Sequence, residues 1–540
     1  MKLRQIKTEI LVFLSVVLIR LPNLGFDIFN TDVWKWKQRI FDFGSGVFGF
    51  SFERTLQMYH PGVTLMWLGS IAVKFFNLYY DIFTGGPPPD NNVGVVFGLH
   101  FVQKLFVVIG IAFVTAFLFH ALKRLFGAKY AVLAIVFMSL EPFYVALTRV
   151  IHLEGLMTTL MLASLAWLFL YLYERKQAQL LISAVFASLA VLTKTSALFL
   201  LPFSGIVLFL FDYEKNKDFI GAIKSSLCVY WKWLLVLIVT FIAVWPSMWV
   251  QPVETISTLY KGIFTTGVDT GHIQLFFGDW TLDPGPLFYF VVLFLRSSVY
   301  LLLGMLLLPF VIKKFDIKRK QIISYLVLFA ILYFVGMTIP SKKLDRYLLP
   351  SMMALLLAVV FAFEWLVEKI SKRFNVSQIV TSLLFVLPVL AYLCYLHPNY
   401  IAYYNPLGGG LSKGMHIIEP KWTFGQEELS EYFKQVIVED GREGFGEDSL
   451  QSLYWKDALR KKLVVALPEK YYTQLYPFFR GIDGWAVIEA FTPDAQQSSH
   501  YVYPVWADYS EEHGRFRLEY RGSVYLQNVP IYNVYDRYDK

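Results

Sequence analysis

Residues 341–368, SKKLDRYLLPSMMALLLAVVFAFEWLVE, decide the fold of this chain. The run that follows Arg346 is almost entirely apolar. It is as long as the roughly 20 residues that an α-helix needs to cross a ~30 Å hydrocarbon core. Lys342, Lys343 and Arg346 place three cations just before this run. The stretch therefore predicts a membrane-spanning helix with positive charge gathered at one end.

Similar apolar runs recur along the chain. It has 540 residues, of which 56% are hydrophobic and 18% aromatic, and this is too apolar for a soluble domain of that length. We predict a mainly α, polytopic membrane protein of about 11 transmembrane helices. The predicted spans are 8–24, 98–122, 129–147, 153–173, 178–193, 195–212, 232–249, 287–312, 321–339, 346–368 and 377–396.

Basic residues fill every second loop between these spans. The positive-inside rule assigns such loops to the cytoplasm, which makes the N-terminus cytoplasmic in a multi-pass protein of the plasma membrane. One long helix over 178–212 would move the run Lys313–Lys320 outside, so two helices are preferred. The net charge of +8 comes from these loops and does not indicate a nucleic-acid partner.

Two domains are predicted. Residues 1–396 form the transmembrane domain, whose first outer loop, about 26–97, contains a semi-apolar stretch, Gly62–Tyr80, typical of an interfacial helix. Residues 397–540 form a small extracytoplasmic α/β domain. Within it, strands are expected at Lys462–Leu467 and Tyr501–Trp506. A hairpin is expected from Arg515–Tyr520 and Val524–Tyr535, with its turn at 521–523.

Polar and ionisable clusters outside the basic loops fall on the predicted outer face. They include Asp32, His60, Arg149, Glu154, His272, Asp283 and the cluster Lys342, Lys343, Asp345 and Arg346. Ionisable groups at the membrane edge are costly and default to a functional hypothesis. Both charge signs gathered at one interface indicate an active site.

Each of these signals also has a plain structural reading. Asp32 suits a helix cap, and Arg149 and Glu154 would pair at the interface. His60, followed by Pro61, suits the start of the interfacial helix. The three cations before the span would snorkel to lipid phosphates. At helical spacing, Lys342 and Arg346 would share one face and Lys343 would point elsewhere.

One reaction class uses all of these parts. Transfer of a sugar from a polyprenyl-phosphate donor needs a carboxylate to take the proton of the acceptor hydroxyl. It also needs cations that hold the departing phosphate, and a site open to the bilayer that holds the donor's tail. The sequence therefore predicts an integral membrane glycosyltransferase acting on the extracytoplasmic face. Its partners would be a polyprenyl-phosphate-linked sugar, the lipid bilayer, and a protein, lipid or glycan acceptor.

The chain also resembles the GT-C superfamily of polyprenyl-phosphate-sugar-dependent glycosyltransferases, close to the protein O-mannosyltransferases and the lipid A aminoarabinose transferases. The shared features, in chain order, are Asp32, His60-Pro61, Arg149 to Glu154, Leu192-Thr193-Lys194 with Pro202, Asp283-Pro284-Gly285 with Phe288-Tyr289, Arg346-Tyr347 with Pro350, and Pro398-Asn399-Tyr400 to Pro406 with Gly408-Gly409-Gly410. The chain departs from the family pattern at Val33, Gly62 and Glu154, where relatives carry an acid, a proline and, in many cases, an aspartate.

This resemblance implies a GT-C type fold and inverting transfer. It implies that Asp32 is the general base and Glu154 a supporting acid. The residues that would bind the donor phosphate are His60, Arg149, Lys342, Lys343, Arg346 and Tyr347, and those on the substrate side are His272 and Asp283. No cofactor is required, although Asp32 and Glu154 offer hard oxygen ligands to a divalent cation such as Mg²⁺ or Mn²⁺.

Two other classes fit the same composition. A secondary transporter or lipid-linked-sugar flippase would gather its charges near the bilayer midplane, in broken helices and often in repeats. Here the charges lie at one interface and the sequence shows no repeat. A structural membrane scaffold would not explain the cation cluster on the predicted outer face.

The orientation is testable by thiol labelling in intact cells. Cysteines introduced at Gly410 and beside Asp283 are expected to react with an impermeant reagent, because both positions lie on the predicted outer face. A cysteine at Asp316 should react only after permeabilisation. Labelling of position 316 in intact cells would contradict the arrangement of all the charges on one face.

Overall fold

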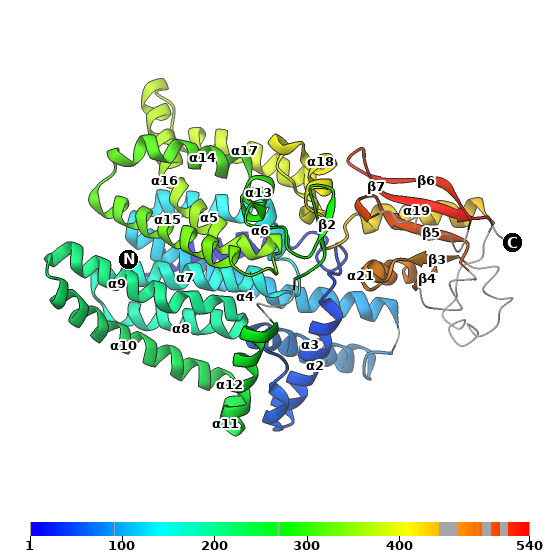
Figure 1. Ribbon diagram of the computed structural model, residues 1–540, viewed down its shortest axis with the longest axis horizontal. Coiled ribbons are helices and arrows are strands. Elements are labelled where there is room, and N and C mark those ends of the chain that lie inside the picture. The colour runs from blue at the N-terminus through cyan, green and yellow to red at the C-terminus, as the bar shows by residue number, and fades with distance from the viewer. Residues whose placement is uncertain are drawn as a thin grey trace.

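A helical bundle and a mixed β-sheet occupy opposite ends of the molecule in the computed structural model (Figure 1). The structure describes residues 2–90, 92–266, 271–441, 463–482, 484–488, 498–507 and 517–538. The helices are α1 (Lys2–Arg20), α2 (Val33–Phe48), α3 (Val63–Thr84), α4 (Val93–Phe126), α5 (Ala128–Leu140), α6 (Pro142–Leu147), α7 (Leu153–Glu174), α8 (Gln177–Thr193), α9 (Leu200–Asn216), α10 (Phe219–Val244), α11 (Ser247–Val250), α12 (Pro252–Lys261), α13 (Phe288–Arg296), α14 (Val299–Val311), α15 (Ile317–Thr338), α16 (Leu349–Phe374), α17 (Gln378–Leu396), α18 (Gly410–Ile417), α19 (Gln426–Glu439) and α21 (Glu469–Arg480). The strands are β1 (Gln274–Phe276), β2 (Asp279–Thr281), β3 (Val464–Leu467), β4 (Trp485–Ile488), β5 (His500–Pro504), β6 (Leu518–Leu526) and β7 (Val529–Arg537).

The bundle is that of a multi-pass membrane protein. Among the described residues, seven helices are long and apolar enough to cross a membrane, or up to eight if the bent pair α13–α14 forms one span. All eleven predicted intervals overlap helices. However, α1, α5 and α8 are not among the helices that are long and apolar enough to cross a membrane. The membrane class and the mainly α fold with a C-terminal sheet are therefore confirmed, whereas the number eleven stays a prediction.

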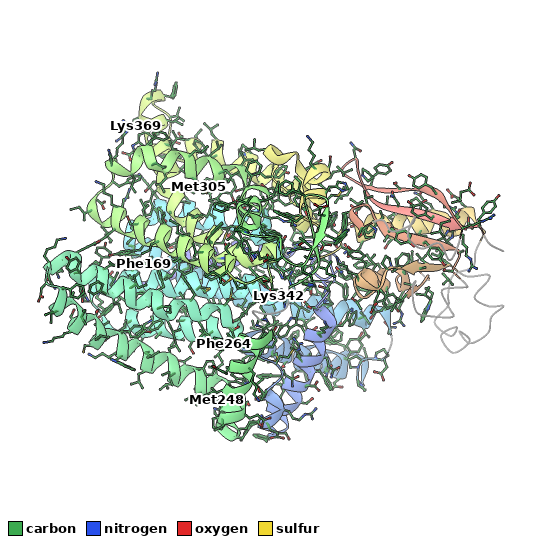
Figure 2. All side chains as sticks on the ribbon, viewed as in Figure 1. Phe169, Met248, Phe264, Met305, Lys342 and Lys369 are labelled. Atoms are coloured by element: carbon green, nitrogen blue, oxygen red, sulfur yellow. The ribbon has the colours of Figure 1, made fainter. Side chains whose placement is uncertain are left out.

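The two ends of the bundle differ in their surroundings. Lys369, near the end of α16, lies far from the sheet, while Lys342, just before α16, lies where the bundle meets the C-terminal part of the chain (Figure 2). Because α16 is long enough to cross a membrane, these two lysines mark opposite membrane edges. The edge that carries Lys342 faces the sheet.

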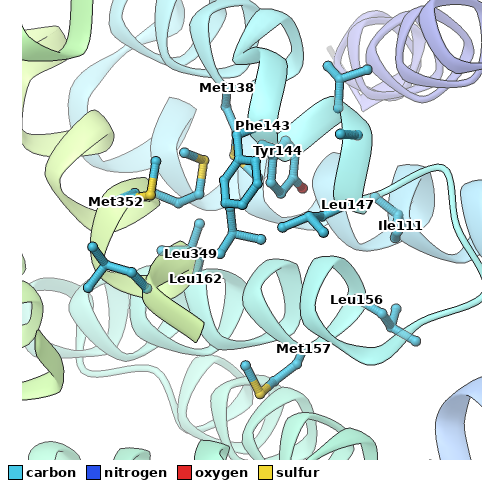
Figure 3. Packing of buried hydrophobic residues seen from close by; sticks show 14 of the residues in the cluster. Ile111, Met138, Phe143, Tyr144, Leu147, Leu156, Met157, Leu162, Leu349 and Met352 are labelled. Carbon is cyan, nitrogen blue, oxygen red and sulfur yellow. The ribbon is translucent and has the colours of Figure 1, made fainter. Parts of the chain in front are cut away.

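Helix α7 is the centre of the bundle. The 18-residue apolar stretch of α7 is entirely buried inside the protein. In α10, by contrast, only 11% of the corresponding stretch is buried. Leu156 and Leu162 of α7 pack in one apolar cluster with Phe143 of α6 and with Leu349 and Met352, which belong to α16 (Figure 3). Since α7 is surrounded by protein on all sides, any charged residue at its start must find partners inside the protein.

A sharp break separates α13 from α14, whose axes differ by 109°. Ser298 caps α14. The backbone N–H and the hydroxyl of Ser298 donate hydrogen bonds of 2.9 and 2.5 Å to the buried carboxylate of Glu141. A buried carboxylate is tolerated where such donors satisfy it. Glu141 therefore anchors the break to the turn between α5 and α6.

The segment predicted as the first outer loop contains two helices, α2 and α3, which pack against each other. Helix α3 covers the predicted interfacial stretch at Gly62–Tyr80 and extends to Thr84. The Ser70 hydroxyl donates a hydrogen bond of 2.8 Å to the carbonyl of Ile40 in α2. This packing fixes the start of α2, where Asp32 lies, relative to the bundle.

The sheet of the C-terminal region has the strand order β4-β3-β5-β7-β6. Strand β3 runs parallel to β4 and β5, whereas β7 is antiparallel to both β5 and β6. The strands expected at Lys462–Leu467 and Tyr501–Trp506 correspond to β3 and β5, although Lys462 lies outside the described residues. The division of the chain at residue 397 stays a prediction.

The predicted position of the hairpin turn was wrong. The turn lies at Gln527 and Asn528, both in the left-handed region with φ of 52° and 64°, which suits a tight two-residue hairpin. Residues 521–523 instead lie inside β6, where the register shifts between Tyr520 and Gly522. A glycine within a strand often marks such an irregularity rather than a turn, and the sequence alone did not separate the two readings. Arg515 and Phe516 of the expected first strand lie outside the described residues.

Candidate active site

Three chain segments bring charged side chains to the end of the bundle that faces the sheet. Asp32 immediately precedes α2, Glu154 lies in the first turn of α7, and Arg346 belongs to the 3₁₀ turn η5 (Asp345–Leu348) that leads into α16. An acid in the first turn of a helix is favoured by the partial positive charge of the helix N-terminus. The start of α7 is thus a suitable place for a buried carboxylate.

Glu154 is the most enclosed member of the cluster, with 1% of its surface exposed. Its Oε1 atom lies 2.7 Å from Lys194 Nζ and 3.4 Å from Arg346 Nε. Its Oε2 atom contacts His152 Nδ1. The predicted structural pairing of Glu154 with Arg149 was therefore wrong, because other basic groups neutralise this carboxylate.

Asp32 is the more accessible acid, with 33% of its side chain exposed. It occupies the N-cap position of α2, yet its side chain makes no capping hydrogen bond. Its Oδ2 atom instead lies 3.4 Å from His152 Nε2 and 3.8 Å from Arg346 Nη2. Burial raises the pKa of the Asp32 carboxyl, but the hydrogen bond and charge of His152, followed by the charge of Arg346, outweigh burial and hold the pKa well below its ordinary value.

His152 bridges the two acids. Its Nε2 atom faces Asp32 and its Nδ1 atom faces Glu154, so both ring nitrogens are placed to donate. Only the imidazolium form carries two N–H donors. Burial lowers the pKa of His152, but the charge of Glu154 and the hydrogen bonds to both carboxylates raise it above its ordinary value. The site therefore favours a charged histidine.

A cavity of about 190 Å³ adjoins this cluster. One part of its wall is polar and another apolar. Its lining residues are Tyr59, His60, Glu154, Met157, Lys194, Thr195, Ser196, Ile263, Tyr333, Met337, Pro340, Lys342 and Tyr347. A lining that combines two lysines and a carboxylate with Met, Ile and Pro side chains suits a ligand with an anionic group and an apolar part.

His60 and Tyr347, which the family resemblance assigned to the donor phosphate, both lie in this wall. His60 Nδ1 is 3.4 Å from the Thr195 hydroxyl. Burial, together with the positive charge of Lys194, lowers the pKa of His60 to about 3. The imidazole is therefore neutral at physiological pH, and Tyr347 offers its ring to Lys194, whose Nζ lies 3.9 Å from the ring centroid.

The three cations before α16 separate from one another. Lys342 lines the cavity, Arg346 reaches the two acids, and Lys343 Nζ is paired with Asp283 Oδ1 at 2.7 Å. Residues 341–344 are not helical, so the helical spacing that was expected to group Lys342 with Arg346 does not hold there. The expected separation of Lys343 from the other two is nevertheless observed.

Arg149 does not join the cluster. It is 1% exposed and its Nη2 atom lies 3.0 Å from Asp27 Oδ2. The carbonyls of Arg20 and Pro22 accept further hydrogen bonds from it at 2.6 and 2.7 Å. Its guanidinium is engaged in holding the end of α1, so this structure offers it no direct role at a donor phosphate.

His272 and Asp283 are not among the residues that line the cavity. Asp283 forms an ion pair with Lys343, and the side chain of Asp283 is 49% exposed. His272 lies just before β1, where desolvation and the charges of Lys421, Lys342 and Arg346 lower its pKa to about 4.

Two members of the cluster received no role from the sequence. Lys194 follows α8 directly, and a lone lysine between two apolar runs is a signal that could have pointed to it. His152 lies two residues before Glu154, and its sequence context carries no comparable signal. Its bridging position depends on how α2 meets α7, which no local pattern shows.

A divalent cation does not fit this arrangement. Within the described parts of the chain, no three His, Cys, Asp or Glu side chains form a group suited to hold a metal. Lys194, Arg346 and His152 already neutralise Glu154, and their positive charges would repel an added cation. The two acids expected as ligands are instead bridged by basic side chains.

The charge on His152 makes a pH-dependent contribution to stability. A histidine whose pKa is raised on folding stabilises the native state fully below its unfolded pKa of about 6.5 and loses this effect as pH rises through the folded pKa. His152→Gln is therefore expected to lower the free energy of unfolding by about 2 kcal/mol at low pH and by less at high pH. Thermal unfolding of detergent-solubilised protein between pH 5.5 and 9 measures this difference.

His416 provides the control, because it lies on α18 outside the cluster and burial lowers its pKa. The variant His416→Gln should not reproduce the trend. A constant difference between wild type and His152→Gln across the range would mean that folding does not shift the pKa of His152, and a difference that grows with pH would mean that folding lowers it.

Comparisons with known proteins bear on the same region. Residues 95–249 match the family model described as dolichyl-phosphate-mannose-protein mannosyltransferase. Among solved structures, ArnT from Cupriavidus metallidurans bound to undecaprenyl phosphate aligns at 14% identity over 97% of each chain, with a TM-score of 0.49. AglB from Archaeoglobus fulgidus, in complex with an inhibitory peptide and a dolichol-phosphate, aligns at 12% identity over 95% of this chain and 72% of its own, with a TM-score of 0.42. The comparison with curated proteins gave no match.

The matched segment runs from α4 to α11 and contains His152, Glu154 and Lys194. It therefore covers the central helix and most of the basic partners of its buried acid. Over this segment the family match confirms the resemblance to polyprenyl-phosphate-sugar-dependent glycosyltransferases that the motifs of the chain led us to expect.

Proposed function

We propose that this chain transfers a sugar from a polyprenyl-phosphate donor to a hydroxyl group of an acceptor. One observation carries the proposal: an accessible acid, Asp32, and a buried acid, Glu154, share Arg346 beside a cavity with cationic and apolar walls. The family match over residues 95–249 supports the same chemistry, because the family's description names a lipid-phosphate-linked sugar donor.

Asp32 is the proposed general base. Its carboxylate is ionised at physiological pH and a third of its side chain is exposed, so an acceptor hydroxyl has access to it. Glu154 is unsuited to this role because three basic side chains surround it and it is almost fully buried. Glu154 instead holds Lys194 and Arg346 in place.

Arg346, Lys342 and Lys194 are the proposed contacts of the donor phosphate. The Lys342 ammonium lies at the cavity wall, and the Lys194 ammonium lies over the ring of Tyr347 in the same wall. Preorganised cations stabilise charge that grows on a leaving group, and this is where an enzyme gains rate. His60, which is neutral, can donate or accept one hydrogen bond at the same wall.

Donor binding would also activate the base. Arg346 lies 3.8 Å from Asp32, and its positive charge contributes to the low pKa of that carboxyl. A phosphate in the cavity would attract Arg346 and weaken this contact, which raises the proton affinity of Asp32. Proton uptake by Asp32 would then accompany the departure of the lipid phosphate.

We further propose that transfer is inverting and takes place on the extracytoplasmic side of the plasma membrane. A single base and direct attack by the acceptor require no covalent intermediate on the protein. The basic loops favour a cytoplasmic N-terminus, which places the cluster and the C-terminal region outside. The acceptor is a protein, lipid or glycan, with His272 and Asp283 on its side.

Replacement of the base tests the reaction directly. Asp32→Asn keeps the size of the side chain but removes its proton-accepting charge, and transfer should fall by about 10²–10⁴-fold. The measurement is the incorporation of radiolabelled sugar by purified protein in lipid, with polyprenyl-phosphate sugars offered in turn. Asp42→Asn is the matched control, because Asp42 lies on the same helix and pairs with the exposed Arg54. Near-normal transfer by Asp32→Asn would show that Asp32 is not the base.

Donor titration tests the proposed phosphate contacts. Arg346→Ala and Lys342→Ala should raise the donor concentration needed for half-maximal rate and lower the turnover rate, because each removes a charge at the departing phosphate. Lys343→Ala is the control and should have a milder effect, since Lys343 is paired with Asp283. Equal losses in all three variants, restored by added anionic lipid, would mean that these cations serve the membrane surface only.

A further inference from the structure

The C-terminal region sends one aromatic side chain into the charged cluster. Trp422, in the segment between α18 and α19, is only 2% exposed. Its ring centroid lies 5.1 Å from the Arg346 guanidinium carbon and 5.1 Å from the His152 ring, which meets it at 64°. Trp422 therefore touches both basic groups that connect the two acids.

We infer that Trp422 is a positioning residue, which holds Arg346 and His152 against Asp32 and Glu154. The donor-phosphate site is then completed by the C-terminal region and does not belong to the membrane bundle alone. This inference rests on the proposed function, because it concerns how the same site binds its lipid phosphate.

Arg346 needs such support because its ionic contacts are long. Its distances to Glu154 and Asp32 are 3.4 and 3.8 Å, beyond the usual range of charge-assisted hydrogen bonds. The guanidinium instead lies near two aromatic rings, that of Trp422 at 5.1 Å and that of Tyr347 at 5.8 Å. A cation beside aromatic faces in a desolvated site gains energy without a fixed hydrogen-bond geometry, so Arg346 is held yet free to move toward an anion.

Trp422 is itself firmly held by its neighbours in the chain. The Thr423 backbone N–H donates to Gln474 Oε1 at 2.8 Å, and that of Gly425 donates to Asn399 Oδ1 at 2.8 Å. Lys421 donates to the carbonyl of Ile273 at 2.9 Å, which ties the segment to the chain just before β1. Hydrogen bonds of the residues before and after Trp422 thus fix the position of its backbone.

The indole N–H does not explain the position of Trp422. Its Nε1 atom is buried and finds no acceptor among the described residues. A buried donor without a partner is unfavourable, so the packing of the ring must provide the stabilisation. Phenylalanine would keep an aromatic face for Arg346, whereas leucine would fill space without one.

The test combines Trp422→Phe, Trp422→Leu, Arg346→Ala and the double variant Trp422→Leu/Arg346→Ala in the full-length protein. The probe is undecaprenyl phosphate, which has the chemistry of the leaving group, and its dissociation constant is measured in detergent. Thermal unfolding of the same samples without lipid gives the stability of each variant. Trp506, equally enclosed in the C-terminal region at 4% exposure, provides the control variants Trp506→Phe and Trp506→Leu.

Trp422→Leu is expected to weaken lipid binding by about 10-fold, which corresponds to about 1.4 kcal/mol, and Trp422→Phe by much less. Adding Trp422→Leu to Arg346→Ala should cost little further affinity, because both changes remove one contact. Trp506→Leu should lower the unfolding temperature and leave the dissociation constant unchanged. Wild-type affinity in Trp422→Leu, or fully additive losses, would overturn the inference while leaving the proposed function intact.

The stability data separate the two proposals. If the wild type binds no undecaprenyl phosphate, the proposed function is contradicted. Non-additive losses of unfolding temperature in the Trp422 and Arg346 variants would then still support the positioning contact, and additive losses would overturn it.

Discussion

The buried carboxylate of Glu154 is the constraint on which the rest of the site depends. An isolated carboxylate in the interior costs several kcal/mol, and only close basic partners with good geometry offset this cost. Lys194, Arg346 and His152 provide them from three different segments. The start of α7, the end of α8 and the turn before α16 must therefore meet at one point, and the cavity forms where they meet.

A second buried network shows what distinguishes a structural cluster from a reactive one. Asp27 is bound by Lys104 and Arg149, and the remaining Arg149 donors reach backbone carbonyls. Charge and hydrogen bonding are balanced there, and its members are nearly inaccessible. The cluster around Glu154 differs in three respects: Asp32 is partly exposed, Arg346 makes long contacts, and a cavity adjoins it. Such incomplete satisfaction beside a cavity is typical of sites that await a ligand.

The sequence predicted most of the bundle and the end of it that carries the site, because apolar runs and basic loops are local signals. It also brought Asp32, Glu154, His60, Lys342, Arg346 and Tyr347 to one region. It failed where long-range contacts decide. Arg149 was assigned to the donor because nothing local revealed its pairing with Asp27, and His152 gained no role because its partners come from two helices. The hairpin turn was predicted at the wrong position because a glycine such as Gly522 occurs at irregularities within strands as well as in turns.

The position of the cluster at the membrane edge explains why a C-terminal region packs over it. A site of the proposed kind, which takes a lipid phosphate from the bilayer and an acceptor from the aqueous side, has to be open on both sides, yet its charges act most strongly when water is excluded. Helices that end at the membrane edge cannot cover such a site. By our inference Trp422, whose neighbour Lys421 is bonded to the carbonyl of Ile273, provides that cover at Arg346. The C-terminal region would thus keep Arg346 in an aromatic environment, while Lys342 lines the cavity together with apolar side chains.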